Sequence, residues 1–567
     1  MISSNTKEGC CGGGGCSSKK ETAPAFPPLT AQPRKRTPVE QPEIPGFRTD
    51  NRDTQTRFHF HMDLCIGCHS CEVACAEQNA LPAHTQWRRV GEVQSGTFPD
   101  TESFFLSSGC NHCLDAPCAK GCPVDAYEIN DNGIVIHKDD VCIGCGYCTW
   151  NCPYGVPTMQ EDRRIVTKCD MCHNRLEQGK DPACVQACPA GAITIETVPL
   201  EQIYAEHMEN GIGPDMPSPS ISIPSTKITL PKGMDIDSFT KVDQPFVKPE
   251  HPHTPLIIMT VLTQLGFGGF CTIFLADLIR TLFFESAEAG NMLGWLAPTL
   301  MGIIGMSLGA STLHLGRPIH AGRAMKNWKT SWLSREILGL SAFAGAAMVY
   351  SVFLFATEGL QILDPAQLGG SMVRLALGAG TVVCGIAGIY CSSMIYRVPA
   401  RPAWDSIKTT IDFFDVAAIL GPVSFIVASM IAMVITETSI SFLESAMQAA
   451  AVFAILAFLF KHTKNAYVIN MWLNSDTFEL KASAEMRVKR FGRLRMLRNC
   501  IGITGMLTLS AFTAETPMST IGLLATALLA LGLFMAVSFI NRYIFFVSVV
   551  PRNIPGNYLI AATESAH

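Results

Sequence analysis

The residues with the clearest chemistry are sixteen cysteines between positions 65 and 188, in a chain of 567 residues with 23 cysteines. They form four groups with short, repeated spacings: Cys65, Cys68, Cys71 and Cys75; Cys110, Cys113, Cys118 and Cys122; Cys142, Cys145, Cys148 and Cys152; Cys169, Cys172, Cys184 and Cys188. Intervals of two residues let one tight loop present three thiolates to three corners of an iron–sulfur cubane, while a fourth thiolate points to a second cluster. The spacing therefore predicts [4Fe–4S] ligands.

A structural zinc site is the main alternative, because zinc is also held by four thiolates. Zinc ribbons present two separated cysteine pairs, whereas these groups are mostly a triplet followed by an outlying fourth cysteine. The group from Cys169 to Cys188 has an eleven-residue gap and would resemble a zinc site by itself. Beside the other three groups, we interpret it as an iron–sulfur group too.

Composition divides the chain into segments, because the apolar residues are concentrated in its second half. Many cysteines without an apolar secretory stretch favour metal ligation over disulfides. The net charge of −5 gives no sign of nucleic-acid binding. We predict a disordered Cys/Gly/Pro-containing arm at 1–57, a cluster domain at 58–198, a Pro-rich linker or strap at 199–254, a membrane anchor at 255–545 and a tail at 546–567.

Long apolar runs follow the Pro-rich segment, and most reach the ~20 residues that a membrane-spanning helix requires. They lie at 255–277, 292–313, 335–357, 371–393, 411–435, 442–460, 497–514 and 519–540. The run at 497–514 is the weakest, since Asn499 and Gly505 interrupt it. The predicted fold is an α+β ferredoxin-like domain of two paired bis-[4Fe–4S] modules, followed by an all-α membrane domain of eight helices.

The cysteine-rich segment resembles the four-cluster electron-transfer subunit of dimethyl sulfoxide reductase and related molybdoenzymes, over residues 58–200. The resemblance is carried by the stretches from Ser108 to Cys113, from Asp140 to Gly155 and from Thr167 to Cys172. It implies four ligand sets: Cys65, Cys68, Cys71 with Cys188; Cys169, Cys172, Cys184 with Cys75; Cys110, Cys113, Cys118 with Cys152; and Cys142, Cys145, Cys148 with Cys122. Nitrate-reductase-type relatives carry Trp where Cys145 stands, so four complete cubanes are expected here. Ala76 replaces the proline that follows the other groups.

The segment from Ser311 to Pro318, with Tyr396-Arg397 and Pro402-Ala403-Trp404, resembles the membrane anchor of the same reductases. The resemblance implies haem-free menaquinol oxidation with His314 at the quinol site. Histidine also suits proton acceptance near neutral pH, although a histidine capping a helix end is the plain alternative. Arg317 is a second candidate, for anchoring a quinone carbonyl. No haem is expected, because His314, His320 and His462 are peripheral to the runs.

The charge of the loops predicts how the chain is oriented in the membrane. Eight spans place both termini on one side, with the loops at 314–334, 394–410 and 461–496, which are rich in Lys and Arg. By the positive-inside rule this side, with the cluster domain, is cytoplasmic in a bacterial inner membrane. Several relatives are exported, so the periplasmic orientation stays open.

Together these features predict an electron-transfer and anchor subunit that takes electrons from the menaquinol pool in the lipid and passes them to a separate molybdopterin-containing catalytic chain. Alternatives are a polysulfide- or thiosulfate-reductase-type module, a redox module of a larger respiratory complex, or an ion pump. A pump requires ionisable residues deep in the spans, and these are scarce. The terminal substrate and the direction of electron flow are not encoded in any feature above.

Overall fold

The computed structural model describes residues 53–83, 85–210, 213, 216–283, 290–364, 370–436, 441–513 and 518–558. The N-terminal arm up to residue 52, with Cys10, Cys11 and Cys16, lies outside the described residues.

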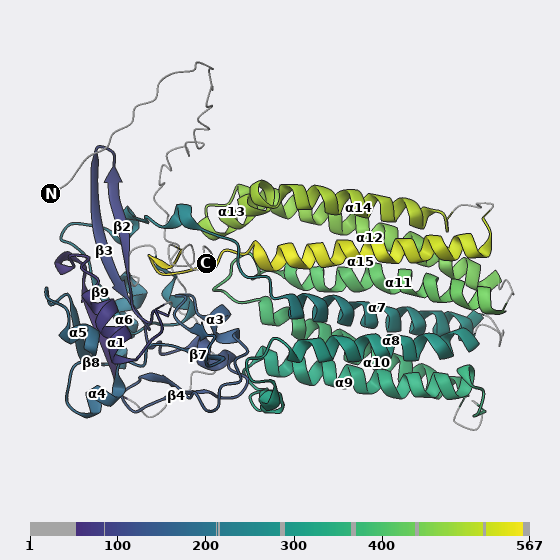
Figure 1. Ribbon diagram of the computed structural model, residues 1–567, viewed down its shortest axis with the longest axis horizontal. Coiled ribbons are helices and arrows are strands. Elements are labelled where there is room, and N and C mark those ends of the chain that lie inside the picture. The colour runs from purple at the N-terminus through teal and green to yellow at the C-terminus, as the bar shows by residue number, and fades with distance from the viewer. Residues whose placement is uncertain are drawn as a thin grey trace, which may run out of the picture. The chain divides into compact units, whose positions relative to one another are not determined.

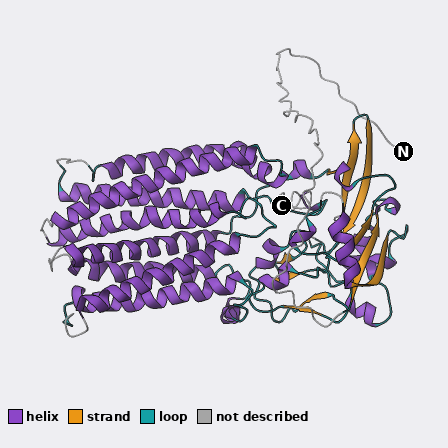
Figure 2. Cartoon of the chain, turned by 180° about the vertical axis from the view of Figure 1, so that it is seen from behind, coloured by secondary structure: helices purple, strands orange, loops and turns teal. Residues whose placement is uncertain are grey.

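The cluster domain is built from short strands and helices joined by cysteine-bearing loops. Its strands are β1 (Thr54–His61), β2 (Arg89–Thr97), β3 (Asp100–Ser108), β4 (Tyr127–Ile129), β5 (Val135–His137), β6 (Thr158–Gln160), β7 (Ile165–Thr167), β8 (Ile193–Pro199), β9 (Lys227–Thr229) and β10 (Phe239–Lys241). Its helices are α1 (Ser70–Gln78), α2 (Pro117–Gly121), α3 (Tyr147–Asn151), α4 (His173–Glu177), α5 (Ala183–Gln186) and α6 (Leu200–Asn210). The strands and the irregular loops lie together in one part of the molecule (Figure 2).

Strand pairing brings the first and last cysteine groups together. β1 precedes the first group and pairs antiparallel with β8, which follows the fourth, with Phe58 opposite Ile195. The hairpin β4–β5 lies between the second and third cysteine groups, and the hairpin β6–β7 lies between the third and fourth. The core around β1 is made of apolar residues such as Phe58 and Phe60, with cysteines such as Cys71 and Cys110 packed among them.

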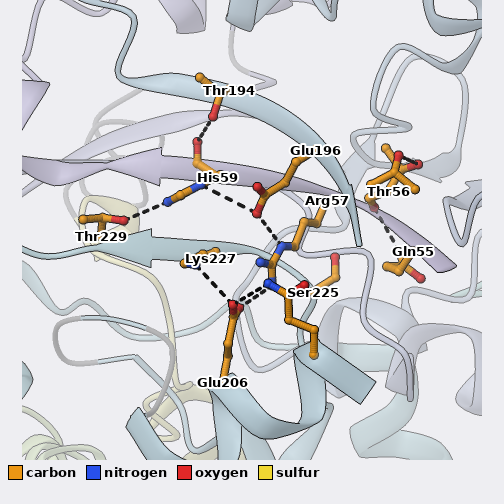
Figure 3. A network of polar contacts seen from close by, with 12 residues as sticks. Gln55, Thr56, Arg57, His59, Thr194, Glu196, Glu206, Ser225, Lys227 and Thr229 are labelled. Atoms are coloured by element: carbon orange, nitrogen blue, oxygen red, sulfur yellow. Dashed lines mark hydrogen bonds and ion pairs between the residues drawn. The ribbon is translucent and has the colours of Figure 1, made fainter. Parts of the chain in front are cut away.

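A buried guanidinium fixes the sheet around β1. Arg57 is fully buried and donates to Glu196 of β8 at 2.8 Å and to Glu206 of α6 at 2.6 Å, as Figure 3 shows. Lys227 of β9 reaches Glu206 at 3.1 Å. Burial alone would raise the pKa of Glu206, but these ion pairs outweigh it and lower the pKa to about 2. Because a buried charge is tolerated only when it is paired, this network ties three elements to one strand.

The Pro-rich segment, predicted as a linker or strap, extends the sheets of the cluster domain. β9 pairs parallel with β1, and β10 pairs antiparallel with β2, with Phe239 opposite Ser95. Helix α6 follows β8 directly.

The remaining chain forms a helical bundle whose helices run side by side (Figure 1). They are α7 (Thr254–Phe283), α8 (Gly290–Thr312), α9 (Trp332–Leu354), α10 (Gly370–Tyr396), α11 (Ile407–Thr436), α12 (Ser441–Leu473), α13 (Phe478–Glu485), α14 (Gly492–Ser510) and α15 (Thr520–Val547). The apolar windows of α7 and α11 are each 78% buried, against 28% for those of α10, α12 and α15. Helices α7 and α11 therefore form the centre, and the others present apolar faces outward, as lipid-facing helices do.

Within the described residues, seven helices are long and apolar enough to cross a membrane. The sequence predicts eight spans, and the remaining run corresponds to α14, which packs along α15. Helix α14 is 19 residues long and is not among the seven. Its first turns carry Arg493, Arg495, Arg498 and Asn499, which lower its hydropathy.

The loop after α8 binds the backbone of the cluster domain. Gly316 donates to the carbonyl of Gly144 at 3.1 Å, and Asn327 donates through its side chain to the carbonyl of Cys122 at 2.8 Å. A Cβ on Gly316 would lie 2.2 Å from the carbonyl oxygen of Arg164, so only glycine permits this approach. Trp150 of α3 packs its ring against Trp404, at 5.4 Å between centroids. The cluster loops are thus seated directly on the bundle.

Candidate electron-transfer and quinol site

Three cavities in the cluster domain are each lined by four cysteines. The sets are Cys65, Cys68, Cys71 and Cys188; Cys110, Cys113, Cys118 and Cys152; and Cys122, Cys142, Cys145 and Cys148. In each set, three thiols come from one group and the fourth from another. The structure therefore brings together the combinations that the resemblance implies.

The remaining four cysteines also approach one another. The thiol of Cys75 interacts electrostatically with Cys172 and Cys184, and that of Cys169 interacts with Cys75. We call the sets after their first cysteines: the Cys65 set, the Cys75 set, the Cys110 set and the Cys122 set.

Electrostatic interactions between thiols of different sets give the order of the sets in space. Cys71 of the Cys65 set interacts with Cys184 of the Cys75 set. Cys169 of the Cys75 set interacts with Cys110, and Cys148 of the Cys122 set interacts with Cys118 of the Cys110 set. The order is therefore Cys65, Cys75, Cys110 and Cys122.

The cavities fit a cubane better than a single ion. Zn–S bonds of about 2.3 Å would bring four sulfurs within about 4 Å of one another. In the described part of the chain, no three His, Cys, Asp or Glu side chains converge in the manner of a mononuclear metal site. Burial raises the pKa of Cys75 and of Cys145 to about 12, so ionised thiolates there require added positive charge, which cluster iron supplies.

Two buried cations lie at the junctions between sets. Arg88 is 3% exposed and interacts with Cys71 and Cys75, so it lies between the first two sets. Lys168 is 2% exposed and interacts with Cys110 and Cys169, between the next two. With clusters bound to the cysteines, the positive charge of Arg88 and Lys168 would favour the reduced form of the neighbouring clusters.

A cavity of about 210 Å³ lies where the Cys122 set meets the bundle. Ile143, Cys145 and Tyr147 line it from the cluster domain, and His314 and Glu336 line it from the membrane domain. Most of its other lining is apolar, from α7, α8, α9 and α10. An apolar cavity of about 150 Å³ is enough to hold benzene, so this one suits a larger aromatic ring.

His314 has its tautomer fixed by a backbone contact. Its Nδ1–H donates to the carbonyl oxygen of Ser311, which leaves Nε2 as the proton acceptor. Burial lowers the pKa of His314, and the bond to Ser311 opposes the shift. A lowered pKa keeps the imidazole neutral, and able to accept a proton, in mildly acidic conditions.

Glu336 is a candidate that the sequence analysis did not identify. It lies in the first turns of α9, is 4% exposed, and its Oε1 has no hydrogen-bond partner within the described residues. An unpaired polar atom buried beside a cavity is costly unless a ligand pairs with it. The sequence offered one signal for Glu336, because it is a carboxylate inside an apolar run. Ionisable residues within membrane helices are rare and usually functional.

Arg317 is not among the residues that line the cavity. Its guanidinium donates to the carbonyl of Asp139 at 2.9 Å, and its backbone N–H donates to Ile143 at 3.0 Å. It thus binds the peptide that leads into the third cysteine group.

These features define an iron–sulfur domain fused to a membrane anchor. Residues 101–198 match the 4Fe-4S dicluster domain, and residues 249–547 match the DMSO reductase anchor subunit (DmsC). The chain belongs to this anchor family, with an iron–sulfur subunit fused in front of the anchor.

Relatives of the iron–sulfur part have names from several oxidoreductases. One chain of the anaerobic dimethyl sulfoxide reductase of Escherichia coli is 36% identical over 162 residues, which cover 27% of this chain and 78% of that protein. One subunit of the sulfite dehydrogenase of Allochromatium vinosum is 32% identical over 224 residues, which cover 34% of this chain and 92% of that protein. The formate dehydrogenase iron–sulfur subunit of Wolinella succinogenes is 37% identical over 165 residues, which cover 25% of this chain and 82% of that protein.

Proposed function

We propose that this chain oxidises menaquinol in the cavity beside Cys145 and passes the electrons through four [4Fe–4S] clusters to a separate molybdopterin-containing subunit. The observation that carries the proposal is the cavity itself. One wall is the cysteine loop of the Cys122 set, and the opposite wall carries His314 and Glu336.

Quinol oxidation releases two protons, so the site requires two acceptors. Nε2 of His314 accepts one, because Nδ1 already donates to Ser311. The unpaired Oε1 of Glu336, which lines the same cavity, is the second acceptor. Tyr147 and Trp150 cover the cavity from the cluster domain and keep water out.

The clusters supply one-electron carriers between quinol and the catalytic partner. The chain's own part is to hold the four sets in order, from the Cys122 set at the cavity to the Cys65 set. Arg317 positions the first step, because its guanidinium holds the Asp139 and Cys142 carbonyls against the loop of His314.

The far end of this order supports a docking face for the catalytic chain. Cys68 is exposed, and Ile66 and Val73 beside it are 64% and 65% exposed. Exposed apolar side chains around the last cluster are expected where a partner covers them.

The topology belongs to the proposal as well. Counting α14 as an eighth span places both termini on the cluster side, which positive loops assign to the cytoplasm of a bacterial inner membrane. Protons would then leave quinol on the side where the acceptor is reduced, and turnover would be electroneutral. Net charge movement per turnover in proteoliposomes would contradict this part.

The test is quinol-driven cluster reduction in a His314→Ala variant, followed by electron paramagnetic resonance. We expect reduction by menaquinol to be lost while dithionite still reduces all clusters. His320→Ala, in the same loop but outside the cavity lining, is the matched control. Normal quinol reduction in His314→Ala would remove this residue from the mechanism.

A sulfur-compound reductase module is the second candidate, and a dehydrogenase working in the opposite direction is a third. The names of the sulfite and formate dehydrogenase relatives keep the third open. The protein that co-purifies in mild detergent distinguishes them.

A further inference from the structure

A second cavity lies in the bundle, between α11, α12, α14 and α15, and it is lined by an unusual excess of positive charge. Its charged lining residues are Lys408, Asp412, Lys461, Arg487, Arg495, Arg498 and Arg542. Asn465, Ser538 and Asn541 add polar groups. None of these residues lines the cavity beside Cys145.

The carboxylates nearby are already used by lysines. Asp412 binds Lys408 and, at 2.6 Å, Lys464, and Asp415 also binds Lys464. Within the described residues, the four arginines and Lys461 therefore make no close ion pair with a carboxylate, and Asp412 attracts Lys461, Arg487 and Arg542 only from a longer distance.

The arginines have only neutral partners within the described residues. Arg542 donates to Gln264 at 3.0 Å, Arg487 to Ser548 at 2.7 Å, and Arg498 to Asn541 at 2.8 Å. The Nε atoms of Arg542 and Arg495 are buried without a hydrogen bond. Lys461 is 5% exposed and makes no close hydrogen bond or ion pair in the described part of the chain, although Asp412 and Asp415 attract it from a longer distance.

Such a cluster is unstable without a negative charge, because desolvating a charge costs several kcal/mol unless an ion or hydrogen-bonding partner replaces water. Arg542 is 4% exposed and Arg487 is 6% exposed, so water solvates little of their charge. A guanidinium group can donate two parallel hydrogen bonds to two oxygens of one phosphate. The missing partner is therefore an anion with several oxygens.

The surroundings of the cavity indicate a lipid as the source of the anion. Phe460 precedes Lys461 and is 55% exposed, and Met496 and Leu497 between two of the arginines are 67% and 53% exposed. These side chains belong to helices whose outer faces are apolar. A phosphate in the cavity would thus have its acyl chains on adjoining apolar surface, and basic pockets between membrane helices are known to accept such headgroups.

We propose that this cavity binds the phosphate of an anionic phospholipid, with Arg487, Arg498 and Arg542 as the principal ligands. The site tethers α14 to α11 and α15 through the bound headgroup. It is independent of the quinol site, so either proposal can fail without the other.

The test uses the full chain in phosphatidylcholine nanodiscs, with increasing phosphatidylglycerol, and measures the thermal unfolding midpoint. We expect phosphatidylglycerol to raise the midpoint saturably, and inorganic phosphate in phosphatidylcholine nanodiscs to leave it unchanged. In Arg498→Gln the phosphatidylglycerol fraction for half of the effect should rise by about tenfold, as expected for one lost charge-assisted hydrogen bond. Arg493→Gln removes a charge from the same helix outside the cavity lining, and it should respond as the unmodified chain does.

Lys461→Gln keeps the test independent of folding defects. Because it removes an unpaired buried charge, its midpoint without anionic lipid should equal or exceed that of the unmodified chain, while its gain from phosphatidylglycerol should shrink. The proposal is overturned if phosphatidylglycerol acts no differently from phosphatidylcholine, if Arg498→Gln and Arg493→Gln respond alike, or if inorganic phosphate alone reproduces the effect.

Discussion

The cluster domain and the membrane bundle both bury cations, but they balance them differently. In the bundle, Arg280 and Arg374 share two carboxylates: both bind Asp277 and Glu358, at distances of 2.5–3.0 Å. In the cluster domain, Arg88 and Lys168 have no such carboxylate pair within the described residues, and they lie among thiols instead. In this part of the bundle protein carboxylates balance the arginines, whereas in the cluster domain the balancing negative charge would come from cysteine thiolates, which ionise when clusters bind.

The largest effect should follow from removing one thiol of a set. Cys148→Ala should abolish one cluster, lower bound iron by about a quarter or more, and destabilise the cluster domain, because metal binding and folding are coupled. Iron analysis and limited proteolysis measure both effects. Cys271→Ala, in α7, is the matched control, and equal iron loss in the two variants would refute the assignment.

The next largest effect concerns the proton acceptor that only the structure identifies. Glu336→Gln preserves shape but cannot accept a proton, so quinol oxidation should fall by about 10²-fold or more. Steady-state kinetics with a menaquinol analogue measure the change, and iron content should stay normal. Unchanged kcat in Glu336→Gln would exclude a proton-transfer role.

A smaller change should follow from removing a cation between two sets. Arg88→Met should lower the reduction potential of the neighbouring clusters, because a positive charge favours the reduced form. A lost interaction of about 1.4 kcal/mol corresponds to about 59 mV for a one-electron couple. Potentiometric titration followed by electron paramagnetic resonance measures it. Lys120→Met, exposed and paired with Asp115, is the control, and a potential unchanged in Arg88→Met would contradict the electrostatic role.

A further effect, seen only in acid, concerns the contact between the two regions. His253 packs against Trp150 at 5.1 Å between ring centroids, and burial lowers its pKa to about 4. Since the unfolded chain protonates near 6.5, stability should be complete above pH 6.5 and fall as pH drops towards 4, by about 3 kcal/mol at most. Unfolding midpoints against pH test this, and His253→Gln should flatten the decline. An equally steep decline in His253→Gln would assign it to other groups.

The two regions also differ in what their sequences reveal. Cysteine spacing predicted the cluster loops, because ligand geometry dictates local spacing, but the combination of thiols across groups came from resemblance. The cavity that Cys188 completes depends on the pairing of β1 with β8 over a long sequence separation, whereas Cys122 is joined to its set across the short hairpin β4–β5. Spacing alone carries no information about that pairing.

Hydropathy predicted where most membrane helices lie, but not what they hold. Glu336 resembles an ordinary helix-start carboxylate until its cavity is visible. Arg317 was predicted as a second candidate, for anchoring a quinone carbonyl, and its guanidinium donates to the Asp139 carbonyl. The strands β9 and β10 are three residues each, too short for a periodic pattern, and they form because they extend existing sheets.

The central claim is that electrons enter at the Cys122 set and leave by the Cys65 set. Its most direct test compares Cys145→Ala with Cys68→Ala, by menaquinol reduction of the remaining clusters followed by electron paramagnetic resonance. The account predicts that Cys68→Ala leaves the other three clusters reducible by menaquinol, whereas Cys145→Ala leaves none reducible by menaquinol although dithionite still reduces them. Menaquinol reduction of the remaining clusters in Cys145→Ala would contradict the account.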